Sequence, residues 1–149
     1  MKVEDVMVRK VKSVSPDMPI SQALDALTQN EISGLPVIDQ DNKLVGMLTE
    51  KEVLNYILPG YLKKVGSFVY QDNPKVIGNK VKELLQEKKV CEIMRKEVVT
   101  VGPDASLSEV ARTIMIGKAR RVPVVDREDR VVGIIAREDV VKAFMKWEI

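Results

Sequence analysis

The side chains that most often carry enzyme chemistry are scarce in this chain of 149 residues. It contains no histidine, so it lacks the usual general base at neutral pH and the usual zinc ligand. The single cysteine, Cys91, lies near Val90 and Ile93 and has no histidine to activate it, so we interpret it as a buried structural residue. The carboxylates are scattered, without the spacing of a catalytic pair. We therefore expect a protein that is not an enzyme and holds no metal.

Polar side chains lie at the start of two expected helices. Thr49 and Glu52 have the spacing of a capping box, which satisfies free N–H groups of the first helical turn and needs no ligand. Asp139 also lies in an expected first turn, where the helix dipole favours a carboxylate, but Ala136 stands where a capping hydroxyl would be. A binding role stays open at both positions.

Arg120 and Arg121 are the candidate anion ligands. A guanidinium offers a fork of N–H donors that suits phosphate oxygens. Seven of the eight arginines follow residue 89, so we expect the second half of the chain to be the more favourable place for an anion. The alternative is that the pair forms a solvated basic edge.

The overall composition is that of one globular domain, with 45% hydrophobic and 31% charged residues. The 24 basic and 22 acidic residues leave a net charge of +2, which argues against general nucleic-acid binding as a function. No apolar run approaches the roughly 18 residues that cross a bilayer, and the first ten residues contain acids where a signal peptide is apolar. We expect a cytoplasmic protein without a membrane role.

The sequence repeats itself at an offset of 87 residues. Residues 3–57 align with residues 90–144 without a gap, and 13 of the 55 pairs are identical. The identities include residues that punctuate turns and helix starts, which chance would not keep at one offset: Pro16/Pro103, Asp17/Asp104, Pro36/Pro123, Asp39/Asp126 and Gly46/Gly133. Two copies of one structural unit are therefore expected.

Each copy predicts a β-α-β-β-α unit. The expected elements of the first copy are a strand at 11–14, a helix from 20, strands at 35–38 and 44–48, and a closing helix at 51–57, each recurring 87 residues later. The strands are continuous apolar runs, which require burial on both faces, and one unit is too small to provide it. We predict an α/β (α+β) fold of two pseudo-symmetric repeats, 1–57 and 90–149, packed on each other as one intertwined module.

An insert at residues 58–89 has no counterpart in either copy. Pro59 and Gly60 predict the end of the preceding helix, residues 71–74 predict a turn, and the apolar spacing within 81–88 predicts an amphipathic helix. The insert holds seven lysines against three acids, and most of the chain's aromatic residues lie in it or just before it. We expect a mostly helical insert that covers one face of the module or joins a partner subunit.

The two copies together resemble a tandem cystathionine-β-synthase-type (CBS) domain pair, also called a Bateman module. Both carry a D/E-h-M opening, a P-D turn, an h-P-V strand and a G-h-h-x-x-x-D/E turn, where h is apolar. The resemblance implies a stand-alone regulatory sensor with no required cofactor. It would bind AMP, ADP, ATP or S-adenosylmethionine in clefts between the repeats, form a homodimer and regulate a separate protein. The alternative is a ligand-free structural module that dimerises or binds a partner protein.

The resemblance also implies site residues. In the family, a hydroxyl residue followed three residues later by Asp binds the ribose and phosphate. The second copy keeps Asp139 but has Ala136, whereas the first keeps Thr49 but has Glu52. A basic residue before the h-P-V strand would face a phosphate. The full candidate set is Ser13, Ser33, Leu35, Thr49, Glu52, Thr100, Arg120, Arg121, Val122, Pro123, Ala136 and Asp139.

The expected closing helices also bear on assembly. Their apolar positions would be left partly exposed on a lone module, and this predicts a homodimer. The positions are Val53, Leu54 and Ile57 in the first copy and Val140, Val141 and Phe144 in the second.

Overall fold

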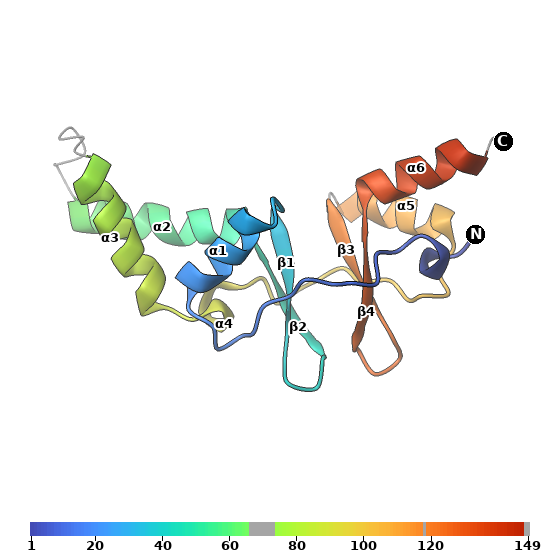
Figure 1. The fold of residues 1–149 in the computed structure, drawn as a ribbon, viewed down its shortest axis with the longest axis horizontal. Helices are drawn as coiled ribbons and strands as arrows, with labels where there is room; N and C mark the ends of the chain where they lie inside the picture. The colour runs from blue at the N-terminus through green and yellow to red at the C-terminus, as the bar shows by residue number, and fades with distance from the viewer. Residues whose placement is uncertain (66–73, 118, 148–149) are drawn as a thin grey trace. The chain divides into compact units, whose positions relative to one another are not determined.

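The chain folds as a mixed α/β protein, as expected (Figure 1). The computed structural model describes residues 1–65, 74–117 and 119–147. The elements are a 3-10 helix η1 (Val3–Asp5), helices α1 (Ile20–Gln29), α2 (Glu50–Val65), α3 (Pro74–Glu87), α4 (Val90–Ile93), α5 (Leu107–Gly117) and α6 (Arg137–Trp147), and strands β1 (Gly34–Ile38), β2 (Leu44–Thr49), β3 (Arg121–Val125) and β4 (Val131–Ala136).

The elements form two compact units, and each unit contains residues from both repeats. Unit 1 consists of Met1–Ser13, Ile38–Val45 and Glu97–Ile149. Unit 2 consists of Val14–Val37 and Gly46–Lys96. The units therefore differ from the repeats because each repeat's opening segment belongs to the unit built on the other repeat.

Unit 1 is built on the antiparallel hairpin of β3 and β4, in which Val122 faces Ile135. Helices α5 and α6 contact each other, and α6 contacts β4. The core contains apolar side chains at the helical spacing expected for α5, from Leu107, Val110 and Ile114, together with strand residues such as Val124. The three residues therefore lie on one face of α5, which is the face that packs into the core.

The opening segment completes the core of unit 1. Val3 and Met7 are buried in that core. The N–H group of Val3 donates to the carbonyl of Ala105 (2.8 Å), and Val8 and Ile134 exchange two backbone hydrogen bonds of 2.9 and 3.0 Å. Residues 1–8 thus supply both apolar surface and backbone pairing to the second repeat.

Unit 2 contains α1, α2, the greater part of β1 and β2, and the equivalent exchanged segment, whereas the tip of the β1–β2 hairpin, from Ile38 to Val45, belongs to unit 1. Val90 at the start of α4 is buried, and its N–H group donates to the carbonyl of Met18 (2.8 Å). Met47 and Arg95 exchange two backbone hydrogen bonds, both of 2.9 Å. This pair is the repeat-related counterpart of Val8 and Ile134.

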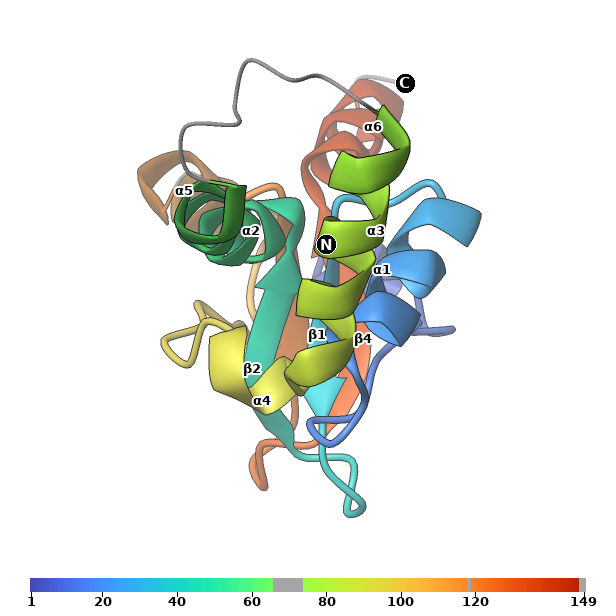
Figure 2. The ribbon, with the colours of Figure 1, turned by 90° about the vertical axis from the view of Figure 1, so that its left-hand side faces the viewer.

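The insert contributes a cover to unit 2. Helix α3 contacts both α1 and α2 (Figure 2), and its side chains Leu84 and Leu85 are buried. The expected amphipathic helix is confirmed, and it begins earlier, at Pro74. The residues 71–73 of the expected turn lie outside the described part of the chain.

Helix α2 corrects one expectation, because it continues through Pro59 and Gly60 to Val65. Proline removes one backbone hydrogen bond and glycine is a weak helix former, so both disfavour a helix locally. Tertiary packing can outweigh such preferences, and α2 packs against α3.

The expected first strands at 11–14 and 98–101 are also shorter than predicted. Each is reduced to one parallel bridge, from Val14 to Val37 and from Val101 to Val124. The N–H group of Val101 donates to the carbonyl of Pro123 (3.2 Å), so the backbone of Pro123 faces this edge of β3. Proline has no N–H group to donate in return. A missing donor there limits how far the pairing can extend.

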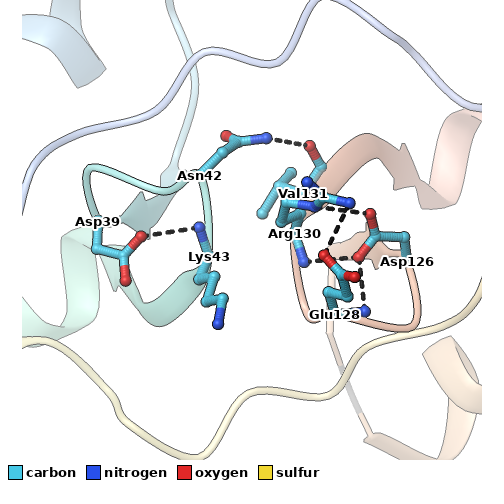
Figure 3. A network of polar contacts seen from close by, with 7 residues as sticks. All are labelled: Asp39, Asn42, Lys43, Asp126, Glu128, Arg130 and Val131. Carbon is cyan, nitrogen blue, oxygen red and sulfur yellow. Dashed lines mark hydrogen bonds and ion pairs between the residues drawn. The ribbon is translucent and has the colours of Figure 1, made fainter.

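The tips of the two hairpins pair within unit 1 (Figure 3). Leu44 donates to the carbonyl of Asp129, Val131 donates to that of Asn42 (both 3.0 Å), and the Asn42 side chain donates to Val131 (2.9 Å). In the second tip, hydrogen bonds from the backbone N–H groups of Arg130 and Glu128 lower the pKa of Asp126. The polar Asp and Asn residues of the loops thus serve as turn formers.

None of the helices in the described part of the chain combines the length and apolarity that a bilayer span requires. Within the same residues, no group of three or more acidic or cysteine side chains gathers closely enough to hold a metal ion.

Candidate functional site

Asp139 lies at the junction of β4 and α6 in unit 1. Its Oδ2 accepts a hydrogen bond from the backbone N–H group of Ala136 (2.8 Å), which closes the first turn of α6. Among the described residues, no hydrogen bond or ion pair uses the other carboxylate oxygen, Oδ1. The carboxylate therefore caps its helix with one oxygen and keeps the second available to a donor.

The two arginines singled out in the sequence line one pocket of about 330 Å³ in unit 1. Ala136, Arg137 and Glu138 complete its lining. Arg137, which the sequence reasoning missed, is tied to the strand edge because its backbone N–H group donates to the carbonyl of Arg120 (3.0 Å). Three guanidinium groups against one carboxylate make this pocket suited to an anion such as phosphate.

Asp139 lines a different pocket, of about 250 Å³, between the opening segment and α6. Its other lining residues are Met1, Asp5, Val6, Lys142, Ala143 and Lys146. The structure thus places Asp139 within hydrogen-bonding distance of Ala136, but it does not place Asp139 and the arginines in a single described pocket.

Of the remaining candidates in the second repeat, two are buried and one is exposed. Val122 and Pro123 are buried in β3, so their side chains belong to the core and they could offer a ligand only backbone groups. Thr100 is exposed beside the Val101 bridge, where its hydroxyl is accessible.

The first repeat's candidates lie mostly in unit 2. The hydroxyl of Thr49 donates to Oε2 of Glu52, and Oε1 of Glu52 lies 3.9 Å from Nε of Arg95. Leu35 is buried in the core, and half-buried Ser33 accepts a backbone hydrogen bond from Glu50 (3.0 Å).

Three outcomes differ from what the residue types suggested. The side chains of Thr49 and Glu52 bind each other directly, a contact that the capping-box interpretation did not include. Ser13 belongs to unit 1, apart from the other first-repeat candidates. Cys91, in the short helix α4, is half-buried, which corrects its interpretation as a buried residue.

Comparison with known proteins identifies relatives over almost the whole chain. The family model for the CBS domain matches residues 3–59 and 90–146. An inosine-5'-monophosphate dehydrogenase of Methanocaldococcus jannaschii is 31% identical over 141 residues, which are 95% of this chain and 23% of that enzyme. This chain therefore spans about a quarter of that relative.

Two solved structures are similar over nearly their full length. CBSX2 of Arabidopsis thaliana in complex with AMP has a TM-score of 0.77 at 26% identity, with 99% of this chain and 98% of that chain covered. The CBS domain pair of protein MJ0100, in complex with 5′-methylthioadenosine and S-adenosyl-L-methionine, has a TM-score of 0.69 at 26% identity, with the same coverage.

Proposed function

Because this chain belongs to the CBS domain family and carries two copies of the domain, we propose that it is a regulatory sensor of an adenosine-containing ligand. The bound ligands of the two similar structures, AMP in one and 5′-methylthioadenosine and S-adenosyl-L-methionine in the other, share the adenosine group. The observation that carries the proposal is the partly available carboxylate of Asp139 at the start of α6.

The chemistry of Asp139 fits a ribose. A carboxylate oxygen accepts hydrogen bonds, and the two ribose hydroxyls can donate them. Phosphates of the same ligand would be bound by the arginine pocket, in which Arg137 adds a cation where Ala136 lacks the hydroxyl found in the family. The other candidates of the second repeat, Thr100, Val122 and Pro123, also belong to this proposed site, the last two through backbone groups only.

We propose that the chain itself catalyses no reaction and needs no cofactor. Its effect would come from a ligand-dependent change in its interaction with a separate, regulated protein. A homodimer and a cytoplasmic location are also proposals. The alternative function is a ligand-free module for dimerisation or partner binding.

Titration calorimetry with AMP, ADP, ATP and S-adenosylmethionine tests this function. At least one ligand is expected to bind, and Asp139→Ala should weaken it roughly ten- to a hundredfold, because hydrogen bonds to a charged group contribute about 1.5–3 kcal/mol. Glu97→Gln removes an exposed negative charge outside both described pockets and is the control.

The same samples separate the alternatives. If none of the four ligands binds, the proposed sensor function is wrong and the alternative, a ligand-free module, is favoured. Ligand recovered after the titration should be chemically unchanged by chromatography, whereas turnover that is lost in a site variant would contradict the assignment as a non-enzyme.

A further inference from the structure

The carboxylate of Glu52 in unit 2 has both oxygens engaged by its own protein. Oε2 accepts from the hydroxyl of Thr49, and Oε1 lies 3.9 Å from Nε of Arg95. The Glu52 side chain is only 11% exposed, whereas that of Arg95 is 50% exposed. The carboxylate is thus the more buried partner of this ion pair, and the arginine is the more exposed one.

Arg95 is held in this position by its backbone. Arg95 and Met47 exchange two hydrogen bonds of 2.9 Å, which join the segment after α4 to β2. Gly46 allows this close approach, because a Cβ atom there would lie 2.9 Å from the carbonyl oxygen of Arg95. The guanidinium therefore extends from a fixed strand edge beside the start of α2.

The repeat-related position in unit 1 differs at one decisive residue. Thr49, Glu52 and Arg95 correspond at the offset of 87 residues to Ala136, Asp139 and Val8. Val8 forms the same backbone pair, with Ile134, but its side chain is apolar and 45% exposed. Asp139 consequently has no cation within ion-pair distance among the described residues.

We propose that Arg95 closes the first-repeat ribose position by acting as an internal counterion of Glu52, so that the chain binds one adenosine ligand, at Asp139. This inference rests on the proposed function. A ribose at Glu52 would have to displace both the Arg95 ion pair and the Thr49 hydrogen bond, whereas a ribose at Asp139 meets an available oxygen. Arg95 is a specificity-determining residue in this arrangement.

Reciprocal substitutions test the inference by calorimetry with AMP. Arg95→Val gives unit 2 the residue that unit 1 has, and the stoichiometry should rise from one to two AMP per chain. Val8→Arg places a guanidinium beside Asp139 and should weaken AMP binding at least about tenfold, the equivalent of about 1.4 kcal/mol. Lys96→Val removes the neighbouring exposed cation and should leave stoichiometry and affinity unchanged.

AMP is a stringent probe because it is an anion, and long-range attraction to the net charge of the chain predicts the opposite change in AMP binding for both variants. Loss of a cation would weaken an anionic ligand and gain of a cation would strengthen it, so the expected changes cannot come from long-range attraction. Thermal unfolding of each variant in the absence of ligand confirms that the fold is retained.

The outcomes distinguish this inference from the proposed function. No binding by the wild-type chain refutes the sensor, and the inference with it. If the wild-type chain binds AMP at two sites, or if Arg95→Val still binds one AMP and Val8→Arg binds as tightly as wild type, Arg95 does not close the site and the sensor function stands.

Discussion

At the scale of single residues, the carboxylates of the two repeats are equivalent in sequence but differ in their surroundings. Asp139 uses one oxygen for its helix, whereas Glu52 is engaged at both oxygens. The offset of the repeats pairs these two residues, and the family resemblance implies a ribose-binding role for them. Arg95 and Arg137 were missed because their relevance depends on which distant residues lie beside them.

The arginine pocket gives a prediction about phosphate. Arg120→Ala and Arg137→Ala should each weaken ATP binding roughly tenfold or more, because each removes charge-assisted hydrogen bonds to phosphate. Adenosine binding should change less than about twofold, since adenosine carries no phosphate. The measurement is calorimetry with both ligands.

Arg127→Ala is the matched control, because Arg127 is exposed and lies outside the lining of this pocket. Equal losses of ATP and adenosine affinity in Arg120→Ala or Arg137→Ala would contradict a phosphate role and indicate a general change in the site.

At the scale of elements, the exchanged opening segments connect sequence motifs to packing. The methionine of each D/E-h-M opening lies against the glycine of the other repeat's strand, Met7 at Gly133 and Met94 at Gly46. The repeat alignment has glycine at both positions. At each one, a methionine sulfur and a backbone carbonyl oxygen lie close to where a Cβ atom would be. These glycines allow close packing, because a larger residue would have no room for its Cβ atom.

This packing predicts different costs for two equivalent substitutions. At Gly46, a Cβ atom would meet the carbonyl oxygen of Arg95 at 2.9 Å, whereas at Gly133 the nearest backbone atom is the carbonyl oxygen of Val8 at 3.2 Å. A backbone atom cannot yield as easily as a methionine side chain. Gly46→Ala should therefore lower the free energy of unfolding by about 1–3 kcal/mol, and Gly133→Ala by less.

Urea denaturation measures both values, and Gly102→Ala is the control, because no atom lies within 4 Å of its added Cβ. That control should stay within about 0.5 kcal/mol of wild type. A cost for Gly133→Ala that equals or exceeds that for Gly46→Ala would contradict the ranking by backbone contact.

At the scale of the whole molecule, the proposed homodimer depends on which closing-helix side chains are exposed. Val53 and Val140 are buried in the protein's own core, which corrects the expectation that they face a partner. Val141 and Met145 on α6 are 60% and 69% exposed, one helical turn apart. Such an apolar face is typical of an interface.

Sedimentation equilibrium at micromolar concentration should therefore detect a dimer. Val141→Lys should shift the chain toward the monomer, because it places a charge in the apolar contact. Lys142→Ala, a neighbouring exposed position, should leave the assembly unchanged. A wild-type chain that sediments only as a 16.7 kDa species contradicts the homodimer.

The sequence alone determined the repeat, the α/β class and most element positions. These features depend on local patterns, namely apolar periodicity and the turn residues conserved at one offset, such as Pro36/Pro123 and Gly46/Gly133. The same patterns identified the polar positions at the starts of α2 and α6. The continuation of α2 through Pro59 and the loss of the first strands were not predictable locally, because tertiary contacts and a missing N–H group decide them.

Only the tertiary structure decided which segments complete each unit. The opening segments pack with the other repeat, and this brings Arg95 to Glu52 and Val8 to the equivalent place near β4. The physical reason is that a carboxylate's availability is set by the donors and cations within a few ångströms of it. Those neighbours come from distant parts of the chain, and no local pattern specifies them.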